Sequence, residues 1–190
     1  MPQRSAVQIV FGILLLIFFS PSGVEAQRND HLTKEEIELV SFNQELDKRI
    51  EIYVKAIERR FLSLNGTSSL SKKELKRLQK DSEKWGEIPN GSQTKLLSDI
   101  DRIIDEAISK IEDVADRNMK SDLLAVAVYK LSDSARSFIP RLEAVRDKSD
   151  SAREVAIANN AISLCQDVIA ASSKLERPTK KKNKKKKKNS

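Results

Sequence analysis

Eight lysines near the C-terminus are the residues whose type and spacing most clearly predict a chemistry. They lie in one run that only Asn183 interrupts: Lys180, Lys181, Lys182, Lys184, Lys185, Lys186, Lys187 and Lys188. Each lysine close to an anionic surface contributes about 1 kcal/mol of attraction, and salt screens all of them together. The run therefore predicts binding to anionic lipid head groups or to an anionic envelope polymer.

The charge of the chain is segregated between this run and the rest of the sequence. Without the eight lysines, 27 of the 35 basic residues remain, against 28 acidic residues. The run has no aromatic side chain to stack on bases and no arginine to contact base edges, so sequence-specific binding of nucleic acid is not expected. A solubilising tail without a specific partner is the alternative.

No set of residues in the chain predicts catalysis. His31 is the only histidine, and it precedes the first predicted helix, so we expect it to be a solvated linker residue and not part of a triad. Serine and lysine are both abundant, and no serine–lysine pair stands out. We therefore predict a non-enzymatic protein without catalytic residues.

Metal ions and cofactors are not predicted either. One histidine cannot supply the two Glu-x-x-His pairs of a di-iron bundle, and the Cys-x-x-Cys-His motif of covalent haem is absent. The acidic clusters at 35–38 and 99–106 alternate with apolar positions, as a solvated helix face does. Cys165 is the only cysteine, so it is either buried or linked to another chain.

The first 26 residues have the three parts of a signal peptide. Arg4 lies in a polar start, an apolar run covers 9–19, and Val24-Glu25-Ala26 offers a cleavage site. As a helix the apolar run would span about 16 Å, against roughly 30 Å of hydrocarbon. We expect cleavage after Ala26, a mature chain that begins at Gln27 without a transmembrane helix, and a periplasmic or secreted location. An uncleaved anchor is the alternative.

Apolar residues recur at three- and four-residue steps along most of the remaining chain, which predicts an all-α protein. Three helix starts carry capping boxes: Thr33/Glu36, Ser71/Glu74 and Ser151/Glu154. The expected helices cover about 33–64, 71–85, 93–118, 124–145 and 151–172. Pro140 should kink or split the fourth of them. A turn is expected over 118–122, with a continuous helix as the alternative.

These elements predict an antiparallel helical bundle of about four long helices plus one short helix. The expected domains are a signal peptide over 1–26, a flexible segment over 27–32, a helical bundle over 33–177 and a disordered, lysine-rich tail over 178–190. Self-association as a coiled coil is an alternative. Asn65-Gly66-Thr67 and Asn90-Gly91-Ser92 match the N-glycosylation motif, but Asn-Gly is also an ordinary turn pair, and turn formation is the preferred explanation.

The sequence thus predicts an exported protein with a partner-binding or envelope-associated role, tethered by its lysine tail. A periplasmic helical chaperone or adaptor is the second hypothesis, and an enzyme is the third. Leu32-Thr33, followed by two glutamates, resembles the Leu-Thr-x-x-Gln repeat of periplasmic helical chaperones in part. Glutamate replaces glutamine and no second copy follows, so no family is assigned.

Overall fold

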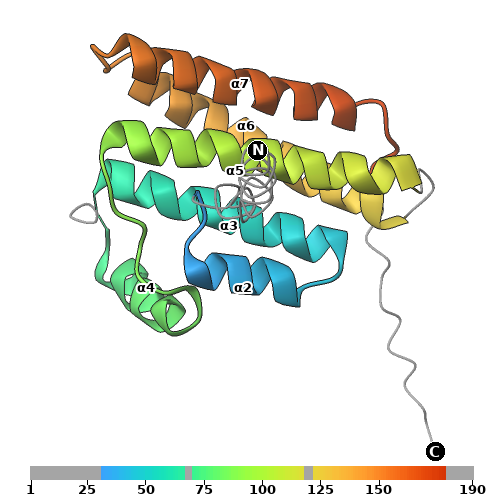
Figure 1. Cartoon of the computed structure of the whole chain (residues 1–190), viewed down its shortest axis with the longest axis horizontal. Helices are drawn as coiled ribbons and strands as arrows, with labels where there is room; N and C mark the ends of the chain where they lie inside the picture. Colours follow the sequence, from blue (N-terminus) through green and yellow to red (C-terminus); the bar gives the residue numbers. More distant parts are fainter. Residues whose placement is uncertain (1–30, 67–69, 118–121, 179–190) are drawn as a thin grey trace, which may run out of the picture. The chain divides into compact units, whose positions relative to one another are not determined.

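The computed structural model describes residues 31–66, 70–117 and 122–178, and these residues form helices without any strand (Figure 1). The helices are α2 (Lys34–Phe42), α3 (Leu46–Asn65), α4 (Lys72–Trp85), α5 (Gln93–Arg117), α6 (Asp122–Arg146) and α7 (Ala152–Ser172). The all-α prediction is confirmed for this part of the chain. The expected signal peptide, residues 27–30 and the lysine run lie outside the described residues.

The predicted capping boxes mark true helix starts. In α2 the Thr33 hydroxyl and the Glu36 carboxylate each accept a hydrogen bond from the other residue's backbone N–H. The same reciprocal pair caps α4 through Ser71 and Glu74. At α7 the serine caps the helix, but its glutamate accepts hydrogen bonds from the side chains of neighbouring residues instead.

The first predicted helix, over 33–64, is two helices in the structure. Asn43 ends α2 in an extended conformation, and both its backbone N–H and its side-chain amide donate to the carbonyl of Leu39. Arg49 then donates to the Asn43 carbonyl across the break, at 2.7 Å. The chain reverses there, so that Glu36 of α2 contacts the second half of α3. Phe42, expected in the apolar stripe, is 85 % exposed as a consequence.

Four helices pack around a common core in the cyclic order α3, α5, α7, α6 (Figure 1). Cross-helix hydrogen bonds fix their directions. α3 pairs with α5 through Tyr53 and Glu106, and α6 pairs with α7 through Ser132 and Ser172. From one contact to the next, residue numbers rise along one helix and fall along the other in each pair, so both pairs are antiparallel.

The two remaining neighbouring pairs are parallel, which a purely antiparallel bundle would not contain. Lys130 and Arg141 of α6 contact α3 in ascending order, at Asp47 and Glu58. Contacts between α5 and α7 also ascend along both helices. The chain still alternates direction from helix to helix, but α5 and α6 lie across the core from one another. This diagonal connection produces the parallel neighbours.

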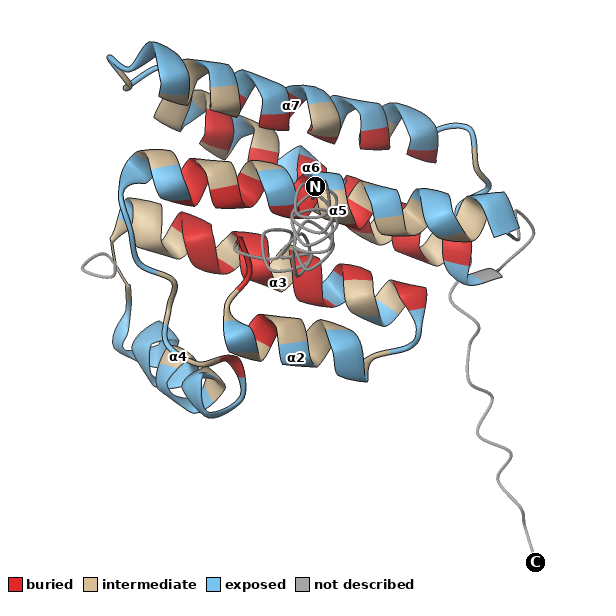
Figure 2. Cartoon of the chain, in the orientation of Figure 1, coloured by how far each residue is buried: buried red, intermediate tan, exposed pale blue. Residues whose placement is uncertain are grey.

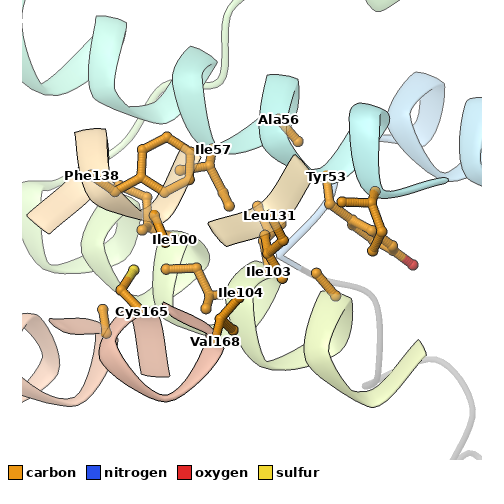
Figure 3. Packing of buried hydrophobic residues seen from close by; sticks show 14 of the residues in the cluster. Tyr53, Ala56, Ile57, Ile100, Ile103, Ile104, Leu131, Phe138, Cys165 and Val168 are labelled. Atoms are coloured by element: carbon orange, nitrogen blue, oxygen red, sulfur yellow. The ribbon is translucent and has the colours of Figure 1, made fainter. Parts of the chain in front are cut away.

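The core contains the residues that the helical period selects in α5, α6 and α7 (Figure 3). Ile100, Ile104 and Ala107 of α5 are at most 1 % exposed, whereas Ile111 is only half-buried. Cys165 is 1 % exposed, and burial raises the pKa of its thiol to about 12. Of the two alternatives for this cysteine, burial is therefore observed.

α6 continues through Pro140 without a break, so this proline does not split the helix. α5 ends at Arg117 and α6 begins at Asp122. Residues 118–121, for which a turn or a continuous helix was expected, lie outside the described residues.

Among the described residues, α7 alone is long and apolar enough to cross a membrane by length and composition. Its inner side contributes Ala161, Ile162, Cys165 and Val168 to the core. A core helix passes the same test.

Candidate functional site

The eight lysines predicted to bind an anionic surface lie outside the described residues, but the chain just before them is well defined. The Tyr129 hydroxyl of α6 donates to the Leu175 carbonyl at 2.8 Å, and the Leu175 side chain packs against the core. Arg177 forms a salt bridge of 2.8 Å with Asp133 and lies over the Tyr129 ring, 5.2 Å from its centroid. α6 therefore holds the chain up to three residues before Lys180.

α4 carries a second concentration of positive charge, which the sequence analysis did not identify. We call it the basic stripe, the five side chains that line a shallow surface hollow: Lys72, Lys73, Lys76, Arg77 and Lys80. All five are exposed, and none forms a salt bridge with another described residue. At 3.6 residues per turn they fall within an arc of roughly 140° and extend over roughly 12 Å of the helix axis.

The basic stripe lies on the outer side of α4. The side chains that are buried or half-buried in this helix, Leu78, Asp81 and Trp85, lie on its opposite side. Eleven of its 14 residues are exposed, and Figure 2 shows the helix almost entirely in the colour of exposed residues. Burial of apolar surface therefore contributes little to holding α4, and its attachment depends on contacts near one end.

That attachment is centred on Trp85, which is buried at the C-terminal end of α4. The Lys55 ammonium of α3 lies 4.8 Å from the centroid of the indole ring and also pairs with Asp81. Arg59 of α3 donates to the carbonyl oxygens of Trp85 at 2.9 Å and of Gly86 at 3.2 Å. A helix leaves such carbonyls unsatisfied at its C-terminus, where positive charge is also favoured by the helix dipole.

Gly86 allows Glu35 of α2 to lie close to the C-terminal end of α4. Its φ of 67° lies in the region that favours glycine, and an added Cβ would lie 2.7 Å from the carboxyl carbon of Glu35. A larger residue would therefore be strained and would push the end of the Glu35 side chain aside.

Behind α2, four charged side chains form a buried cluster: Glu36, Arg59, Arg60 and Asp99, none more than 6 % exposed. Oε1 of Glu36 accepts from Nη1 of Arg60 at 2.6 Å and lies 3.3 Å from Nε of Arg59. Nε of Arg60 lies 4.0 Å from Oδ2 of Asp99. Burial lowers the pKa of Arg59 and raises that of Asp99, because each charged form loses water. Two positive and two negative groups balance, which makes their burial tolerable.

His31 is 5 % exposed, so the expectation of a solvated linker residue was wrong. Its Nε2 lies 2.7 Å from Oε2 of Glu106 on α5, and its carbonyl accepts from Arg60 at 2.6 Å. Oε1 of Glu106 accepts from the Tyr53 hydroxyl at 2.9 Å. Burial alone would raise the pKa of Glu106, but the hydrogen bonds from His31 and Tyr53 outweigh it and lower the pKa. The ionised carboxylate thus holds the segment before α2 against α5.

The buried cluster and the His31 network both stabilise contacts between helices, whereas the basic stripe is open to a ligand. No family model, curated protein or solved structure matches the chain. Within the described ranges, no three His, Cys, Asp or Glu side chains gather so that they could hold a metal ion. The five exposed basic side chains of the stripe are described groups that could contact an anion.

The two glycosylation motifs lie at the same end of α3. Asn65 is the last residue of that helix, and Ser63 donates to the Pro89 carbonyl next to Asn90. Gly66 has a φ of 73°, and the Asn90 side chain accepts from the next backbone N–H at 2.8 Å. Both asparagines are exposed, and turn formation at the two motifs stays a prediction.

The basic stripe was missed because charge was summed over the whole chain outside the lysine run. A local count would have found it: residues 72–85 contain six basic and three acidic side chains. The buried cluster had no comparable signal, since Glu36 and Arg60 occur in a sequence rich in charges that are usually solvated.

Proposed function

We propose that this chain is an exported, non-enzymatic helical-bundle protein that is tethered to an anionic surface by Lys180–Lys188. The observation that carries the proposal is the segregation of charge. Eight of the 35 basic residues lie in one short run, while the other 27 are matched by 28 acidic residues. A dense row of lysines attracts anionic lipid head groups or polymers strongly at short range, in a way that a balanced body does not.

The contacts of residues 175–177 support this role. Leu175 and Arg177 are held by Tyr129 and Asp133 of α6, so the lysine run starts next to the folded domain and not at the end of a long linker. A short connection keeps the domain close to any surface that the lysines bind.

Removal of the lysine run tests the tether. A variant that ends at Pro178 should fold as well as the full chain, because the run adds no apolar side chain to the core. It should bind anionic vesicles at least about 100-fold more weakly, since each lysine contributes about 1 kcal/mol. Co-sedimentation with phosphatidylcholine vesicles, with and without phosphatidylglycerol, measures this difference across a salt series.

Two full-length variants separate charge from length in that experiment. Eight Lys→Gln substitutions keep the length and should reproduce the loss, whereas eight Lys→Arg substitutions should preserve binding. Bound full-length protein should be released as salt rises, because screening weakens all the contacts together. Tight, salt-insensitive binding by the shortened protein would show that the tether hypothesis is wrong.

Export is tested separately by the N-terminus of the mature protein. We expect secreted or periplasmic material to begin at Gln27, because Val24-Glu25-Ala26 presents small or short side chains at the cleavage positions. Mass spectrometry of the intact protein from cell fractions gives the result directly. An intact Met1 terminus in the membrane fraction would indicate the anchored alternative.

A helical chaperone or adaptor is the second proposal, and exposed apolar residues are what favour it. Phe42 is 85 % exposed, and Leu75 and Leu123 are 44 % and 41 % exposed. They lie on three different helices, and isolated apolar residues are normal on protein surfaces. The tethered role therefore has the stronger support.

A further inference from the structure

We propose that the basic stripe of α4 is a second binding site for an anionic lipid bilayer, and that it acts together with the lysine run. This inference rests on the proposed function for the class of surface, but on different residues. The stripe belongs to an ordered helix of the folded domain, so it contributes charge in a fixed arrangement.

Two of the three acidic side chains of α4 are engaged away from the stripe, and the third, Glu83, is exposed and forms no salt bridge with a described residue. Glu74 accepts from the backbone and hydroxyl of Ser71 at the helix start, and these hydrogen bonds, with a smaller effect of the Arg77 charge, lower its pKa. Asp81 lies on the opposite side and pairs with Lys55 of α3. The five basic groups therefore face solvent without a salt bridge to any described residue.

The form of the stripe fits a bilayer better than a shaped ligand. It is broad and open, because its side chains come from one helix and cover roughly 140° of it. Four of its five members are lysines, which act as point charges without the fork geometry that selects individual phosphates.

The attachment of α4 explains how the stripe can act with the lysine run. Trp85 and Arg59 fix the inner end of the helix, so the domain can present the stripe without first ordering a segment. Once one basic segment is bound, the other meets the surface at a high effective concentration. Two moderate electrostatic contacts then give one stronger attachment.

The test combines two changes in all four combinations. The stripe is altered by Lys73→Gln, Lys76→Gln and Lys80→Gln, and the lysine run is removed after Pro178. A matched control removes the same number of positive charges from exposed positions outside α4, through Lys48→Gln, Lys148→Gln and Arg153→Gln. Circular dichroism and the fluorescence of Trp85, the only tryptophan, verify that each variant is folded with α4 in place.

Binding to phosphatidylcholine vesicles with phosphatidylglycerol should weaken about 10- to 100-fold on alteration of the stripe, with and without the lysine run. The matched control should change binding less than about 3-fold. Equal effects of stripe and control variants would overturn the inference, even if loss of the lysine run abolished binding and so supported the tether. If only the stripe mattered, the tether and the joint action would both be wrong, and the stripe alone would be the bilayer-binding site. A stripe variant that binds vesicles normally but no longer binds duplex DNA would replace the bilayer with a soluble polyanion and overturn the proposal.

Discussion

Replacing Glu36 with glutamine will lower the free energy of unfolding by about 3–5 kcal/mol, the usual effect of removing one partner from a buried ion pair. Glu36 is fully buried and contacts both Arg59 and Arg60. Glutamine preserves the shape of the side chain but removes its charge, which leaves Asp99, also paired with Lys95, as the remaining acidic member of the cluster. Urea denaturation, monitored by circular dichroism, measures the loss. The slope of the unfolding free energy against urea concentration should stay unchanged.

Glu38→Gln is the matched control, because Glu38 lies on the same helix and is exposed. It should change the free energy of unfolding by less than about 0.5 kcal/mol. Adding Arg60→Met to Glu36→Gln should cost less than the sum of the two single changes, since the uncompensated charge is then removed as well. Additive losses, or equal losses for Glu36→Gln and Glu38→Gln, would contradict a coupled buried cluster.

Replacing Ile104 with alanine should reduce the free energy of unfolding by about 2–5 kcal/mol, through lost burial and the cavity that remains. Ile104 is 1 % exposed at the centre of the core, between α3, α6 and α7 (Figure 3). Thermal and urea unfolding of the purified variant would both report the loss.

Two positions on the same helix give graded controls for Ile104. Ile111→Ala should cost less, because this isoleucine is only half-buried, and Ser109→Ala should have almost no effect on an exposed site. Similar losses at all three positions would mean that α5 is rotated relative to the core or does not pack there.

The sequence predicted the inner sides of α5, α6 and α7 well, because the apolar residues of each helix keep the helical period without interruption. It failed at 43–45, where Leu39, Phe42, Leu46 and Ile50 keep a helical spacing across the break. The side-chain hydrogen bond of Asn43 ends the helix, and a period of apolar residues does not report such a bond.

The order of the helices around the core could not be obtained from the apolar periodicity either. The spacing of apolar residues shows which side of a helix is buried, but not which other helix that side contacts. The parallel pairing of α3 with α6 depends on long-range contacts such as that of Arg141 with Glu58. Both side chains are charged and incompletely buried, so the sequence does not show that they meet. The lysine run is visible as composition, and a local count shows the excess of basic residues in 72–85, but that these side chains face solvent together becomes evident only from the structure.

The burial of His31 also bears on how the proposed mature chain would resist degradation. If export removes residues 1–26, only four residues precede a side chain that is enclosed against Glu106 and whose carbonyl is held by Arg60. Aminopeptidases need a free, extended end, so they would have little chain to digest before they meet the folded domain. Removal of His31 would require local unfolding of this network, and its stability would therefore govern resistance to degradation from the N-terminus.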